Sequence, residues 1–177
     1  MPDKTGKFIE LASLLSDNDS EFLAILELYA NGRMDEFWDE IDSRTPSVDD
    51  QEYFRQSVED EGIEAVIKQG LITFGYIRSN DWKFPLEDML FNAEKSFAHY
   101  GIDVSIYENI PNKDEIVAPE ALKLIVSRLP EGFGMGMWDF GSDSYELIIA
   151  RTQTLETAAK LADELGLQIY ADCSREY

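Results

Sequence analysis

Apolar residues recur every three or four positions through the first third of the chain, which is the spacing of one helical face. Polar residues 16–20 interrupt this pattern, and Asn31 with Gly32 suits the end of a helix, because Gly accepts the left-handed conformation found there. The pattern predicts four helices, at residues 5–15, 20–32, 34–41 and from 49 to 58. We therefore expect the N-terminal part of the protein to be helical.

The pattern changes after Gly70. Residues 71–77 are rich in β-branched and aromatic side chains and precede the turn-forming run Ser79-Asn80-Asp81, which is typical of a strand. Further along, residues 141–144 favour a tight turn between two extended segments. We expect strands at residues 71–77, 104–107, 133–140, 145–151 and 167–170, and helices at residues 85–101, 119–130 and 154–166.

These elements predict an α+β fold, in which a helical N-terminal third precedes a mixed or antiparallel sheet of about five strands with helices packed on it. The 177 residues are close to the usual size of one domain, and no linker rich in Gly, Ser or Pro divides them. We expect a single domain over residues 1–177, with a helical segment at 1–70 and an α/β segment at 71–177.

Acidic residues dominate the composition. The chain has 36 Asp and Glu against 15 Lys and Arg, which gives a formal charge of −21 and a pI of 4.2. Such a charge repels nucleic-acid phosphates and anionic membrane surfaces, whereas it attracts basic proteins and cationic ligands. We therefore predict no nucleic-acid partner and no membrane partner. A basic protein is the partner that the charge favours, although many intracellular proteins are acidic for solubility.

The residues that usually support catalysis are scarce. His99 is the sole histidine and lies late in a predicted helix, and the sole cysteine, Cys173, follows Asp172, whose charge disfavours a reactive thiolate. The chain lacks the Cys and His ligands of a zinc site, and it cannot form an internal disulfide. We therefore predict no enzymatic activity and no cofactor. The N-terminal residues do not form a signal peptide, so we expect a cytoplasmic protein.

Aromatic and acidic residues near the predicted turns are the candidates for ligand binding. Asp139 and Asp143 bracket the hairpin turn and could share a cation, although turn formation also explains them. Large rigid rings such as Trp138 often anchor binding surfaces, but they more often complete a core. The candidate binding residues are Asp81, Trp82, Trp138, Asp139, Asp143 and Tyr145.

Three short segments carry a resemblance. They are Asp81-Trp82-Lys83 after a strand, residues 139–145 at the hairpin and residues 161–166 at the end of a helix. Together they resemble an uncharacterised bacterial family, a domain of unknown function with a helical front and an α+β tail. The resemblance covers the last two-thirds of the chain and implies a bacterial, cytoplasmic protein. It supplies no activity, cofactor or catalytic residue.

The sequence leaves three hypotheses about function. The first is a binding or interaction protein whose acidic surface meets a basic partner, as in immunity proteins that neutralise basic toxins. The second is an enzyme that binds a metal or a small ligand through clustered carboxylates. The third is a structural subunit, which would form a stable oligomer. The sequence does not define the oligomeric state.

Overall fold

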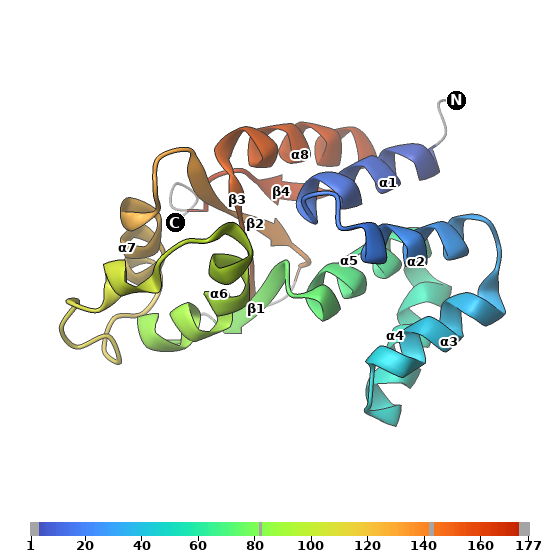
Figure 1. Ribbon diagram of the computed structural model, residues 1–177, viewed down its shortest axis with the longest axis horizontal. Coiled ribbons are helices and arrows are strands. Elements are labelled where there is room, and N and C mark those ends of the chain that lie inside the picture. Colours follow the sequence, from blue (N-terminus) through green and yellow to red (C-terminus); the bar gives the residue numbers. More distant parts are fainter. Residues whose placement is uncertain (1–3, 82, 142–143, 174–177) are drawn as a thin grey trace. The chain divides into compact units, whose positions relative to one another are not determined.

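The computed structural model describes residues 4–81, 83–141 and 144–173. The chain divides into two compact units, a helical unit at residues 1–74 and a sheet unit at residues 75–177 (Figure 1). The helical start and the α+β class are as predicted. That the chain folds as a single domain stays a prediction.

The helical unit contains five helices within its described residues, and polar caps set where two of them begin. The Asp19 carboxylate accepts hydrogen bonds from the Glu21 and Phe22 amides, at 2.9 and 3.1 Å. The Ser47 hydroxyl accepts one from the Asp50 amide at 3.3 Å. Such caps satisfy amides that have no partner inside the helix. The helices are α1 (Lys4–Leu15), α2 (Ser20–Ala30), α3 (Met34–Arg44), α4 (Val48–Glu61) and α5 (Ile63–Phe74).

Helix α5 is central in this unit, because it packs against α1, α2 and α4. Its residue Gly70 faces the ring of Phe22 in α2, and a Cβ atom at this position would lie 2.2 Å from Cε2 of that ring. A glycine is therefore required for the close approach of the two helices. The ring of Phe22 is fully buried there, which is worth roughly 1.5–3 kcal/mol relative to exposure.

The predicted strand at residues 71–77 is wrong. Residues 71–74 form the last turn of α5, and β1 begins only at Ile77. The apolar run 71–77 suits a strand locally, but Ile67 and Leu71 are fully buried one turn apart. Packing of this helical stripe decides the conformation, because β propensity is a weak and context-dependent preference.

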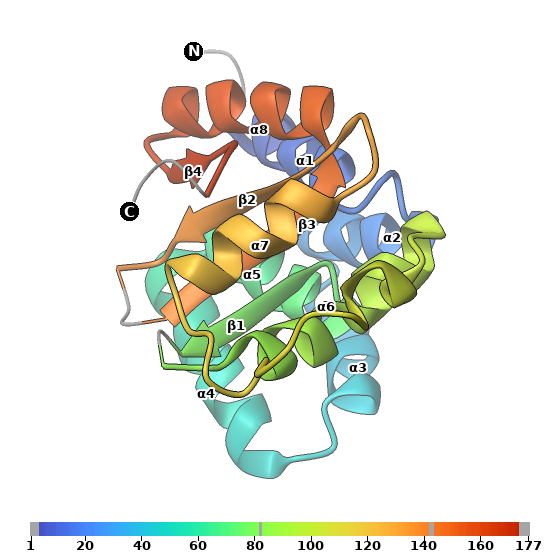
Figure 2. The ribbon, with the colours of Figure 1, turned by 90° about the vertical axis from the view of Figure 1, so that its left-hand side faces the viewer.

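The sheet unit contains a four-stranded antiparallel sheet in the order β1-β3-β2-β4 within its described residues (Figure 2). The sheet is thus antiparallel and has four strands where about five were expected. Its elements are β1 (Ile77–Asp81), α6 (Leu86–Tyr100), η1 (Val104–Tyr107), α7 (Glu120–Arg128), β2 (Phe133–Asp139), β3 (Ser144–Arg151), α8 (Thr152–Leu165) and β4 (Gln168–Tyr170).

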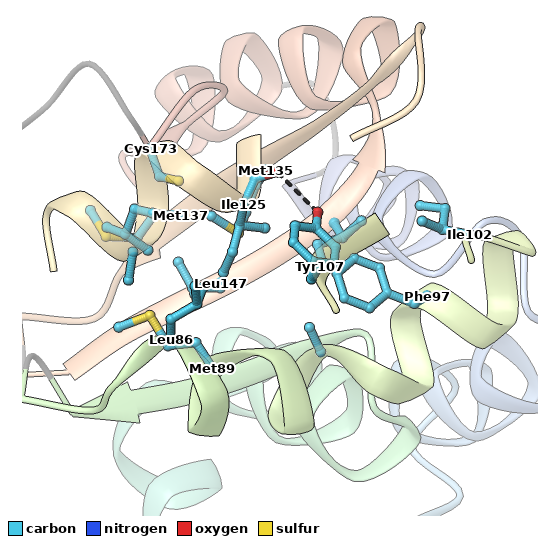
Figure 3. Close-up of a cluster of buried hydrophobic side chains, with 14 of the residues drawn as sticks. Leu86, Met89, Phe97, Ile102, Tyr107, Ile125, Met135, Met137, Leu147 and Cys173 are labelled. Carbon is cyan, nitrogen blue, oxygen red and sulfur yellow. Dashed lines mark hydrogen bonds between the residues drawn. The ribbon is translucent and has the colours of Figure 1, made fainter. Parts of the chain in front are cut away.

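The missing strand is the one predicted at residues 104–107, which instead form the 3-10 helix η1. The Asp103 carboxylate accepts hydrogen bonds from both the amide, at 2.9 Å, and the hydroxyl of Ser105, at 2.7 Å, and this local turn competes with an extended conformation. The turn brings Tyr107 into the core, where its ring stacks on Phe97 and its hydroxyl donates to the Ile125 carbonyl at 2.9 Å (Figure 3).

Helices cover both faces of the sheet. Side chains of alternate residues in β2 and β3, such as Met135 and Leu147, pack with α6 and α7 on one face (Figure 3). On the other face, Gly134 and Gly136 make room for Leu155 of α8. Among the described residues, no helix combines the length and the apolar character needed to cross a bilayer.

Candidate binding site

Two of the predicted site residues lie on neighbouring strands but on opposite faces of the sheet. Asp81 is exposed at the end of β1, paired with Ser144, and its carboxylate accepts a hydrogen bond from the Lys83 amide at 2.8 Å. Tyr145 pairs with Asn80 and packs at the edge of the core beneath α6 and α7, where burial raises the pKa of its phenol. Because side chains alternate along a strand, Asp81 and Tyr145 do not converge.

Trp138 and Asp139 also point to opposite faces of the sheet. The indole of Trp138 is 1% exposed and contacts the ring of Phe140, with 5.2 Å between the centroids. Trp138 therefore completes the core. Asp139 is exposed and accepts a hydrogen bond from the Gly141 amide at 2.7 Å, which shapes the turn.

The other two candidates, Trp82 and Asp143, lie outside the described residues. The four candidates that the structure describes thus share no single surface.

A different surface of the sheet unit is hollowed and carries exposed apolar side chains. It is a groove of about 250 Å³ between α6 and the segment that begins with η1, and we call it the α6–η1 groove. Two of its apolar side chains are unusually exposed, Phe91 at 74% and Val104 at 47%. The groove is lined by Glu87, Leu90, Phe91, Glu94, Val104, Tyr107, Glu108 and Lys113.

Tyr107, which forms the floor of the groove, belongs to the core of the sheet unit. Tyr107 is 1% exposed, and its stacking on Phe97 and its hydrogen bond to Ile125 hold the ring in place. Burial raises the pKa of the Tyr107 phenol to about 12, so the hydroxyl stays protonated and keeps donating. The opposite side of α6 carries buried residues such as Met89.

The rim of the groove is acidic. Glu87, Glu94 and Glu108 are exposed, and none of them forms an ion pair with any residue in the described part of the chain. Lys113 is the one basic residue among the described residues that line the groove. An apolar floor with uncompensated carboxylates around it suits a ligand that is both apolar and cationic.

The sequence contained one signal for this groove. The predicted helix at 85–101 has a regular apolar stripe, which includes Leu86, Met89, Ala93 and Phe97. Phe91 lies off that stripe, on the polar side of the helix. An aromatic residue in such a position is a candidate contact residue, because large exposed apolar groups often mark interaction sites.

Outside the groove, one buried acid is unusual. Glu146 in β3 is 4% exposed, and its Oε1 accepts a hydrogen bond from the Ser79 hydroxyl at 2.9 Å, whereas its buried Oε2 has no hydrogen-bond partner among the described residues. Desolvation raises the pKa of this carboxyl, and the Ser79 hydrogen bond opposes that effect. Burial of this kind destabilises the charged form of a carboxyl group.

The described residues include one thiol and many carboxylates, the groups that could act as a nucleophile or hold a metal ion. Cys173 is fully buried, and burial together with the charge of Asp172 raises the pKa of its thiol to about 12, so a thiolate does not form at neutral pH. Within the described residues, no three His, Cys, Asp or Glu side chains lie close enough together to hold a metal ion.

The fold and the groove define the class of this protein as an α+β protein with a helical unit, an antiparallel sheet unit and an acid-rimmed apolar groove. The chain belongs to the family described as Domain of unknown function (DUF6630), whose match covers residues 7–172. This confirms the resemblance to an uncharacterised family and extends it to nearly the whole chain. No curated protein and no solved structure matches the chain significantly.

Proposed function

We propose that this protein is an acidic binding protein whose α6–η1 groove binds a basic protein partner. The observation that carries the proposal is the exposed Phe91 in a groove whose rim carboxylates have no ion pair in the described chain. Apolar anchors contribute most of the affinity of typical interfaces, while complementary charge speeds association and selects the partner.

The charge of the whole chain supports the same partner. With a formal charge of −21, the field of the protein steers basic molecules toward it and opposes the approach of nucleic acids and anionic membranes. We place this interaction in the cytoplasm. Neutralisation of a basic toxin by an immunity protein is one concrete form of such a function, and it rests on analogy of size and acidity.

The alternative of a metal-dependent enzyme built on clustered carboxylates has less support. It requires acids that converge, and the described residues contain no cluster able to hold a metal. The acids at the groove surround apolar side chains instead. A binding role therefore accounts for the groove better than a catalytic one does.

The test must separate binding in the groove from general attraction to a polyanion. We would titrate the protein with a panel of small basic proteins, including any encoded beside its gene, at ionic strengths from about 0.01 to 0.15 M. The informative variant combines Phe91→Ser with Glu94→Gln. Its matched control combines Tyr53→Ser with Glu59→Gln on α4, where Tyr53 is 72% exposed and Glu59 is also exposed.

Both double variants remove one exposed ring and one negative charge. We expect at least one basic protein to bind roughly tenfold more weakly to the groove variant than to the control variant. Equal weakening of every complex by the two variants would mean that only the net charge matters, and the proposal would then be wrong. Circular dichroism would confirm that both variants are folded.

A further inference from the structure

The side chains along the α6 wall of the groove follow a regular order. Glu87, Leu90, Phe91 and Glu94 occupy positions i, i+3, i+4 and i+7 and so share one face of the helix. The two acids are separated by two helical turns, roughly 10 Å along the axis, with the apolar pair between them. This wall therefore presents acid, apolar pair and acid in that order.

The opposite wall repeats part of this order. Val104 and Glu108 lie four residues apart at η1 and just after it, so an apolar side chain and an acid again face the groove together. Tyr107 closes the floor between the two walls. An occupant would thus place its apolar side chains at the centre and its positive charges at the ends.

We propose that the α6–η1 groove receives a short basic helix of the partner protein, with two adjacent apolar residues flanked on each side by a Lys or Arg three positions away. This inference rests on the proposed function and specifies the element of the partner that is bound. The cations of such a helix are seven residues apart, which matches Glu87 and Glu94. The order is the same in both directions, so the helix can lie parallel or antiparallel to α6.

A helix fits this spacing better than an extended segment does. On one face of a strand, side chains repeat at roughly 6.8 Å and then at 13.6 Å, so cations on that face fall short of or beyond the distance between the two acids. On a helix, positions seven apart share a face at the required distance. Helix-in-groove recognition uses this i, i+3, i+4, i+7 pattern.

Other occupants suit the groove less well. A volume of about 250 Å³ is below the roughly 300–1,000 Å³ that is usual for small-molecule pockets, and the groove is open to solvent. A second copy of the chain would bring two acidic rims together in molecules that each carry a formal charge of −21. A basic helix satisfies both the apolar floor and the acidic rim.

The probes are three Ala-rich peptides of about 14 residues, or four helical turns. The register peptide has two adjacent Leu, with a Lys three positions before the first and three positions after the second. The shifted peptide has the same composition, but each Lys stands five positions from the nearest Leu, which places it on the opposite side of the helix. The charge-only peptide has Ser in place of both Leu.

Binding would be measured by titration with NMR detection of the protein amides, and helix formation by circular dichroism. We expect the register peptide to bind roughly tenfold more tightly than either other peptide and to gain helix on binding. Phe91→Ser should weaken binding of the register peptide roughly tenfold. Glu87→Gln with Glu94→Gln should reduce both the affinity for this peptide and the dependence of that affinity on salt. Tyr53→Ser, and Glu52→Gln with Glu59→Gln, should change the affinity less than twofold.

The outcomes separate this inference from the proposed function. If the register and shifted peptides bind equally, or the register peptide gains no helix or does not bind, the helical partner is wrong. The groove function then still stands if Phe91→Ser with Glu94→Gln weakens a basic protein more than the α4 control does. If neither the peptides nor the basic proteins distinguish the groove from α4, both proposals are wrong.

Discussion

The helical unit and the sheet unit each carry a groove, and the two grooves differ in how their acids are neutralised. The groove between α2 and α3 has a volume of about 410 Å³, and there Arg44 contacts Glu21 at 2.6 Å and Glu40 at 3.5 Å. In the smaller α6–η1 groove, the three acids have no ion pair within the described chain. The acids of the larger groove are therefore partly neutralised by Arg44.

The apolar side chains differ as well. Among the described residues, the strongly exposed large apolar side chains are Val48, Tyr53, Phe91, Val104 and Val117. Two of these line the α6–η1 groove, and none of them lines the groove between α2 and α3. The two grooves therefore differ in the placement of their cations and of their exposed apolar groups as well as in size. If the proposed function holds, we expect charge and apolar exposure to matter more than volume for a basic partner.

The largest effect that we predict concerns the packing that supports the groove of the helical unit. Gly70→Ala should destabilise the protein by about 3 kcal/mol, because the new Cβ would overlap the buried ring of Phe22 in α2, one wall of that groove. Urea denaturation measures the change. The control is Gly6→Ala in α1, where a Cβ meets nothing within 4 Å and stability should rise by about 0.5 kcal/mol. Similar free energies of unfolding for both variants would contradict this packing.

The second prediction reverses one charge in each groove. Glu94→Lys should weaken binding of a basic protein by about 2 kcal/mol, since a like charge then meets the partner at the rim. Glu27→Lys, at an exposed acid that lines the groove between α2 and α3, should cost less than about 0.5 kcal/mol. Calorimetric titration of both variants with the same basic protein measures the two losses of binding free energy. A larger effect of Glu27→Lys would place the partner on the helical unit.

The third prediction extends the contrast to the interior of the sheet unit, where Glu146 forms no ion pair with any described residue that would balance its burial. Because its folded-state pKa is raised, the native protein holds this proton to higher pH than the unfolded chain does. Its contribution to stability is therefore lost as pH rises from the ordinary carboxyl range through the folded pKa. Glu146→Gln should raise stability at pH 7 by about 1 kcal/mol and remove this pH dependence.

Thermal unfolding of the wild type and Glu146→Gln between pH 4 and about pH 8 measures the difference, and other acids cancel in it. Ser79→Ala is the companion variant, because it removes the hydrogen bond that lowers the pKa of Glu146. It should steepen the loss of stability as pH rises. If the stability of Glu146→Gln differs from that of the wild type by the same amount at every pH, the buried carboxyl is not desolvated as described.

The smallest predicted effect comes from removing a cation from the groove of the helical unit. Arg44→Gln leaves Glu21 and Glu40 without their arginine and makes that groove more acidic. We still expect its affinity for the register peptide to rise less than twofold, because no strongly exposed apolar side chain of the described chain lines this groove. A gain of about tenfold would show that charge is sufficient for binding and that an apolar anchor is not needed.

Elements with local signals were predictable. Helix α6 runs from Leu86, after Pro85, to Tyr100 before Gly101, which adopts φ 65°, and its buried stripe was visible in the sequence. The hairpin of β2 and β3 was predicted from its turn composition. Residues 71–74 and 104–107 were not, because burial of Leu71 on α5 and of Tyr107 beside Phe97 overrides local preference.

The candidate site was less predictable than the fold. Trp138 was a candidate contact residue, and its burial places it in the core. Phe91 lies inside a predicted helix, and it lines a groove only because η1 approaches α6 in the folded protein.

The sequence by itself determined the α+β class, the family, most of the helices and the excess of negative charge, because these follow from local patterns and from composition. The tertiary structure decided which acids are neutralised, which aromatic rings are buried and where a groove forms. These features depend on distances between residues far apart in the chain, and such distances exist only once the helices and strands have packed.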